Sequence, residues 1–131
     1  MGVYEGLKLQ LAPIPRLLVV QTSSVNSISK EFDPEFTPEE SSLATGIVSS
    51  VSPRRNQVFN LIKQTSGTAY TVDNEQIKQA YEYLHHNKIQ ASYEAAAGLA
   101  GWWKFENDDS SISKFKTSII ITGKDRKFPN E

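Results

Sequence analysis

Hydroxyl, amide and glycine residues follow the places where apolar strands are expected to end. Thr122 closes the apolar run TSIIIT and precedes Gly123, Gln21 closes the run RLLVVQ, and Gly46 lies in the small-residue segment 43–48. In open α/β sheets, ligands bind beyond the carboxyl ends of the strands. A hydroxyl there can hydrogen-bond a ligand, and a glycine lets the backbone approach it closely. A threonine that closes a strand before a turn and a strand-end glycine explain the same residues without a ligand.

Glu94 is the candidate carboxylate. It opens a segment of small apolar residues that continues as AAAGLAG. A carboxylate at a helix N-terminus is stabilised by the helix dipole, by roughly 0.3–1 kcal/mol. The dipole alone therefore explains Glu94 as well as a ligand contact does.

No metal site is expected. His85 and His86 are adjacent, whereas two helical ligands need i and i+4 spacing to share a face. The chain has no cysteine, which excludes disulfides, thiolate metal sites and a cysteine nucleophile. Trp102 and Trp103 close the small-residue helix, where core and rim packing is the expected role.

The elements that must position these residues alternate between strand and helix. Residues 16–21 and 117–122 are apolar on both faces, which is typical of parallel strands covered by helices. In residues 68–72 polar and apolar side chains alternate more, which predicts a strand nearer an edge of the sheet. Residues 22–42 are polar and acidic, which predicts a solvated loop. This order predicts an α/β fold with a three-layer, mostly parallel sheet and flanking helices.

Two helices lie between the last two expected strands. Periodic apolar residues predict one over 73–86, with Asp73 and Gln76 arranged as a capping box, and small residues predict another near 94–105. An earlier helix is expected to end at Gly67, in the position where positive φ is favoured.

Composition narrows the function classes. The 131 residues fit one domain or a piece of a larger one, and 14 basic against 15 acidic residues leave no electrostatic signature for nucleic acid or an anionic membrane. No apolar run approaches the ~20 residues of a membrane span, and no signal-peptide pattern opens the chain. A cytoplasmic location is the default expectation.

Several pieces of the chain, taken together, resemble a known family. GVYEGLKLQ, IPRLLVVQ, SLATGIVSSVSP, TAYTVDNEQIKQA, SYEAAAGLAG and IIITGKDRK follow one another in the family's order and with similar gaps. They resemble the C-terminal part of threonine synthase, a pyridoxal-phosphate (PLP) enzyme of fold type II, the tryptophan synthase beta-like group. The resemblance covers nearly the whole chain except the 22–40 loop.

The resemblance implies that residues 1–131 form a single α/β segment of the large domain, the C-terminal fragment of a larger enzyme. The cofactor of that enzyme is pyridoxal 5'-phosphate. The Thr122 hydroxyl matches the group that reaches the pyridine nitrogen, Glu94 matches a glutamate near the ring, and Gly46 matches a stretch whose backbone passes close to it. The family's Schiff-base lysine and phosphate-binding loop have no counterpart here, so no catalytic residue is expected and the chain alone is not expected to be competent.

Alternatives remain open at this point. The parent enzyme converts O-phospho-L-homoserine and water to L-threonine and phosphate if it is a threonine synthase; a threonine/serine dehydratase or a cysteate-synthase-like enzyme would use the same cofactor. A third reading is a non-catalytic α/β module that assembles with itself or with the missing N-terminal half. Ser23, Asp125 and Arg126 depart from the family pattern, where glutamate, glycine and leucine are usual.

Overall fold

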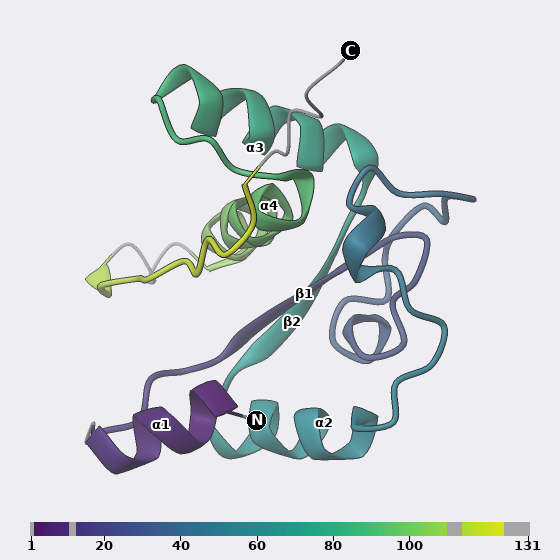
Figure 1. Cartoon of the computed structure of the whole chain (residues 1–131). Helices are drawn as coiled ribbons and strands as arrows, with labels where there is room; N and C mark the ends of the chain where they lie inside the picture. Colours follow the sequence, from purple (N-terminus) through teal and green to yellow (C-terminus); the bar gives the residue numbers. More distant parts are fainter. Residues whose placement is uncertain (1, 11–12, 110–113, 125–131) are drawn as a thin grey trace.

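The computed structural model describes residues 2–10, 13–109 and 114–124. Its regular elements, two of them 3-10 turns labelled η, follow one another along the chain (Figure 1): α1 (Gly2–Gln10), β1 (Leu18–Thr22), η1 (Ser29–Glu31), η2 (Thr45–Ile47), α2 (Arg55–Gln64), β2 (Thr68–Val72), α3 (Asn74–His86) and α4 (Tyr93–Asp108). No helix within these ranges is long and apolar enough to cross a bilayer.

A parallel two-stranded sheet is the centre of the fold. β1 and β2 pair in register from Leu18 with Thr68 to Thr22 with Val72. Helices cover both faces (Figure 1), with α3 and α4 on one side and α2 on the other. The fold class is therefore α/β with three layers, as predicted, and it is consistent with part of a fold type II domain.

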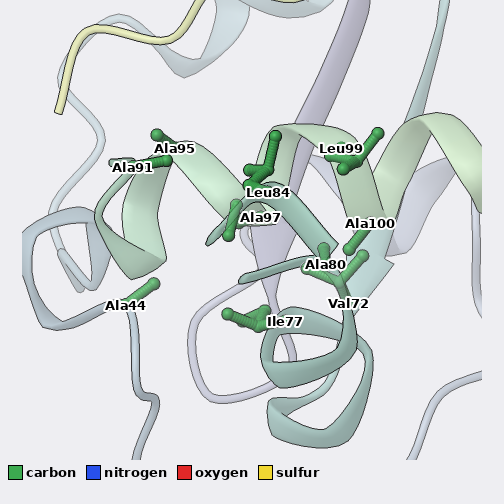
Figure 2. Packing of buried hydrophobic residues seen from close by; sticks show 11 residues of the cluster. Ala44, Val72, Ile77, Ala80, Leu84, Ala91, Ala95, Ala97, Leu99 and Ala100 are labelled. Atoms are coloured by element: carbon green, nitrogen blue, oxygen red, sulfur yellow. The ribbon is translucent and has the colours of Figure 1, made fainter. Parts of the chain in front are cut away.

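The larger core lies on the α3–α4 side of the sheet. Figure 2 shows Val72 from β2 close to Ala80 from α3 and Ala100 from α4, and Leu84 from α3 close to Ala97 from α4. Alanine and glycine let α4 approach the strands closely, because a Cβ on Gly101 would overlap the Val20 side chain. The smaller cluster on the other face joins Ile28, Ile62 and Ala69.

Helix α3 forms where the sequence predicts it. The Asp73 carboxylate accepts from Gln76 N at 2.8 Å, and the Gln76 side chain accepts from Asp73 N at 3.0 Å. This capping box satisfies amides that have no partner within the helix. The buried face consists of Ile77, Ala80 and Leu84, at the predicted spacing.

The prediction of positive φ at Gly67 is wrong. The left-handed residue is Ser66, with φ 51°, and no glycine among the described residues has positive φ. Gly67 is required for a different reason. Its amide donates to Ile62 O at 2.8 Å, and a Cβ there would overlap the carbonyl of Leu17.

The predicted third strand is also wrong. Residues 117–122 run as an extended segment but pair with no strand, and Ile120 is 62% exposed. A strand needs a neighbour for its backbone groups, and no other segment that the structure describes lies in register with this one. The 68–72 strand, expected nearer an edge, is an edge strand of this two-stranded sheet but is more buried than β1, with Ala69 and Val72 fully covered.

Candidate functional site

The N-terminus of α4 is where the residues predicted from the sequence meet. Ser92 is the N-cap, in extended conformation, and its hydroxyl accepts from Ala95 N at 3.4 Å. The next turn carries Glu94, on the end of the helix where the dipole favours negative charge. Behind this turn Ala95 and Ala96 are buried in the core and fix the position of the helix end.

Gly46 contacts Glu94 directly. The Gly46 amide donates to Glu94 Oε1 at 2.9 Å. A Cβ on Gly46 would stand 3.1 Å from the same oxygen, closer than ordinary van der Waals contact. Gly46 belongs to the short turn η2, which is held by the buried Ala44 and by the Leu43 amide donating to Asn74 Oδ1 at 2.7 Å. Two predicted residues, 48 positions apart in the sequence, are thus joined by one hydrogen bond.

The segment that contains Thr122 crosses the same helix end. The Ser92 amide donates to Gly123 O at 3.0 Å, and a Cβ on Gly123 would overlap the Ser92 hydroxyl. Earlier in the segment, the Ile119 side chain lies against Gly98. Thr122 itself is exposed and does not end a buried strand, contrary to expectation. Its position beside Gly123 nevertheless brings it to the end of α4 that carries Glu94.

The Glu94 carboxylate is held in its charged form. Partial burial alone would raise its pKa, but hydrogen bonds from the amides of Gly46 and Glu94 and from the Ser92 hydroxyl outweigh burial. The result is a pKa below the ordinary value for glutamate. This end of α4 therefore carries a fixed negative charge at neutral pH.

Ser92 was not singled out in the sequence, although a signal existed. A serine followed by a tyrosine and then by a run of alanines is a typical helix start, with the serine as N-cap. The helix was expected from about residue 94, one residue after its actual start at Tyr93, so the sequence did not identify the cap. In the structure Ser92 is the residue that contacts both Glu94 and Gly123.

The loop that follows β1 makes more hydrogen bonds to the sheet than a solvated loop would. Gln21 Oε1 accepts from Ile28 N and Ser29 N at 2.8 and 2.9 Å, and the buried hydroxyls of Ser29 and Thr71 are 2.7 Å apart. The hydrogen bonds that water would make in a solvated loop are therefore made here between the loop and the strands. The polar composition of residues 22–42 did not indicate these contacts.

Ser23, one of the departures from the family pattern, donates its hydroxyl to Glu39 Oε2. The same Glu39 oxygen accepts from Asn74 N at 3.0 Å, at the first turn of α3. A carboxylate from the loop therefore lies beside the end of β1, where the family usually has a glutamate in the strand end itself. Asp125 and Arg126 lie outside the described residues.

A second polar cluster lies at the other end of α4. Lys104 Nζ is 2.5 Å from Asp33 Oδ2 and 2.9 Å from Thr71 O, and Tyr70 donates its hydroxyl to Asp108 Oδ2 at 2.7 Å. Burial, this hydrogen bond and the neighbouring carboxylates raise the pKa of Tyr70 well above its usual range. The side chains of Lys104 and Tyr70 both bond to other protein groups, which is typical of residues with a structural role.

Other chemistry-bearing residues do not form a site. His85 Nε2 is 3.0 Å from Ala91 O and its ring stacks on Tyr81, and no metal-binding group of side chains occurs within the described ranges. Trp102 and Trp103 pack against the larger core, as expected. A shallow, largely apolar hollow of about 280 Å³ at the start of α2 includes none of the predicted residues.

Comparison with known proteins gives one finding. The sequence profile of the family described as "Pyridoxal-phosphate dependent enzyme" matches residues 1–123, which is most of the chain. No curated protein matches the sequence at a significant level.

Proposed function

Because the chain belongs to the pyridoxal-phosphate dependent enzyme family, we propose that it is the C-terminal part of a threonine synthase. That enzyme converts O-phospho-L-homoserine and water to L-threonine and phosphate, and this part alone does not carry out the reaction. We further propose that the enzyme is cytoplasmic and acts in threonine biosynthesis. It rests on the order of the sequence pieces and on the cluster at the start of α4.

The observation that carries the proposal is the meeting of Gly46, Glu94 and the Thr122–Gly123 pair at one helix end. The hydrogen bond from Gly46 to Glu94 and the one from Ser92 to Gly123 bring these residues together from distant parts of the sequence. The resemblance to the family implies a position near the cofactor ring for Gly46, Glu94 and Thr122. Their convergence supports a common role.

The residues present fit one end of the cofactor. Thr122 is exposed, so its hydroxyl is accessible to a ring nitrogen. Gly46 is also exposed and has no side chain of its own, and its amide is bonded to Glu94 Oε1. The phosphate end does not fit here, because the Ser92 hydroxyl caps α4 and the Glu94 carboxylate already accepts the nearby amides. An added anion would meet a fixed negative charge at this helix end. This cluster therefore suits the ring and not the phosphate.

When bound, pyridoxal 5'-phosphate supplies an electron sink for elimination and replacement at the substrate's side-chain carbons. Thr122 would hold the ring nitrogen with a neutral hydroxyl, which hydrogen-bonds a pyridine but does not stabilise a protonated one as a carboxylate would. Gly46 and Ser92 hold the Glu94 side chain in one orientation. In this assignment the chain binds and orients the ring and transfers no proton itself.

The substrate is tested by disrupting the coding region of this chain in the source organism and measuring metabolites. Loss of a threonine synthase should make growth depend on added threonine and should cause O-phospho-L-homoserine to accumulate. Loss of a threonine/serine dehydratase should instead raise threonine, because its substrate is no longer consumed. Unchanged levels of both metabolites, with threonine-independent growth, contradict the proposal.

A second candidate is a non-catalytic α/β module that assembles with a partner chain. The observation that favours it is that no strand among the described residues pairs with the outer edge of β1. In either case the partner that we propose is a second copy of the chain or the N-terminal half of the enzyme, and the small-molecule substrate binds only the complete enzyme.

A further inference from the structure

Asn74, the first residue of α3, holds the segment of chain that leads to Gly46. Its side-chain Nδ2 donates to Ser41 O at 3.0 Å, and its Oδ1 accepts from Leu43 N at 2.7 Å. A primary amide carries both a donor and an acceptor, as a peptide group does, so one side chain can bond two backbone groups at once. The Asn74 side chain therefore fixes the segment on both sides of Ser42.

The backbone of Asn74 holds the same segment at a third point. Asn74 N donates to Glu39 Oε2 at 3.0 Å, and that carboxylate also accepts from the hydroxyl of Ser23, directly after β1. Helix α3 is itself held in place by its capping box and its buried face. The segment is therefore attached both to the first turn of α3 and to the end of β1.

Burial alone does not orient the turn η2, which contains Gly46. Ala44, just before the turn, is fully buried in the larger core, and the Ser42 hydroxyl accepts from Ala44 N at 3.1 Å. Apolar burial is non-directional, so one small buried side chain fixes the position of a turn but not its rotation. The direction of the Gly46 amide therefore depends on the hydrogen bonds that hold the preceding residues.

We propose that Asn74 is a positioning residue of the candidate site, which holds the segment before η2 so that the Gly46 amide donates to Glu94. Gly46 lies three residues after Leu43, and its amide is 2.9 Å from Glu94 Oε1. Without the bonds of Asn74 the segment can rotate about Ala44, and the Gly46 amide loses the alignment that a hydrogen bond requires. The importance of this for the cofactor ring rests on the function proposed above, whereas the positioning itself does not.

The test is an NMR titration of Glu94 in the purified chain without cofactor, so its outcome is independent of the proposed reaction. The Gly46 bond is one of the contacts that lower the pKa of Glu94, while burial raises it. Asn74→Ala should therefore raise this pKa towards its ordinary value of 4.5. In wild type the Gly46 amide proton should shift as Glu94 is protonated, because its acceptor loses its charge, and in Asn74→Ala this shift should be lost.

Asn87→Ala is the matched control, because Asn87 lies at the other end of α3 and its side chain donates to Tyr83 O at 2.8 Å. It should leave the pKa of Glu94 unchanged. Asn74→Gln moves the amide by one methylene and should act like Asn74→Ala, which keeps the test decisive if the alanine variant does not fold. A wild-type pKa of Glu94 in a folded Asn74 variant overturns the proposal, and so does an equal rise in Asn87→Ala.

Discussion

The Glu94 carboxylate owes its charge to groups from different parts of the chain. Gly46 comes from a turn before α2, while the Glu94 amide and Ser92 belong to α4 itself. At the residue scale, the sequence identifies Glu94 and Gly46 as separate candidates but does not reveal the hydrogen bond between them. The macrodipole depends only on local helix position, whereas the Gly46 contact depends on how a loop returns to that helix.

The lowered pKa of Glu94 has a consequence for stability. A carboxyl group whose pKa is lower in the folded than in the unfolded state stabilises the fold at pH values above its unfolded pKa, about 4.5 for glutamate. This contribution is lost as the pH falls below that value and through the folded pKa. Glu94→Gln should therefore be less stable than wild type at neutral pH, and the difference should shrink as the pH falls below about 4.5. Urea unfolding across this range measures it. Glu82→Gln, on the exposed side of α3, is the control, and a pH-independent difference for Glu94→Gln contradicts the assignment.

Substitution by alanine should change the stability of the fold in opposite directions at the two glycines of α4, Gly98 and Gly101. A Cβ at position 101 would stand 2.9 Å from Val20 Cγ1, so Gly101→Ala should destabilise the fold by about 1–3 kcal/mol through overpacking. At Gly98 the nearest atom, Ile119 Cγ2, would be at an ordinary 3.5 Å, so Gly98→Ala should stabilise by up to about 1 kcal/mol through helix propensity. Thermal unfolding separates them. Val20→Ala should restore most of the loss in Gly101→Ala, and no restoration would mean that the contact is not the cause.

At the scale of elements, the helices were predictable and the sheet was only partly so. The capping box of Asp73 and the spacing of Ile77, Ala80 and Leu84 are local patterns, and α3 begins and ends within a residue of expectation. The 117–122 run has an equally clear strand composition, yet it forms no strand. A helix satisfies its own backbone, whereas a strand depends on a neighbour elsewhere in the sequence.

The Lys104–Asp33 pair should anchor the loop after β1 to α4. Both side chains are mostly buried, 23% and 12% exposed, so Lys104→Met leaves the Thr71 carbonyl without a donor and Asp33 with the Thr71 amide but no cation. The expected loss of stability is about 1–3 kcal/mol. A double-mutant cycle with Asp33→Asn measures the coupling by chemical denaturation.

The exposed pair Arg55–Glu31, 36% and 47% exposed, serves as the comparison for this cycle. Glu31→Gln should change stability by less than about 1 kcal/mol, because exposed ion pairs are screened by water. Equal effects at Asp33 and Glu31 would show that burial of the first pair does not strengthen it.

On the scale of the whole molecule, the ring contact that we propose at the start of α4 has no counterpart for the cofactor phosphate, because Glu94 carries a negative charge there. We therefore expect that the purified chain, mixed with pyridoxal 5'-phosphate and reduced with borohydride, gives no stoichiometric adduct on one defined lysine. Absorbance and peptide mass mapping provide the measurement, with diffuse low-level labelling as the expected background. A single fully labelled lysine would falsify this expectation and would show that the chain holds the cofactor by itself.

The amino-acid sequence by itself determined the α/β class, the helices and the candidates Gly46, Glu94 and Thr122, because spacing, caps and motif order are properties of neighbouring residues. Tertiary structure alone decided that Gly46 donates to Glu94 and that the Thr122 segment lies against α4 instead of in the sheet that the structure describes. These features depend on contacts between segments far apart in the chain, and local preferences of the residues do not specify such contacts.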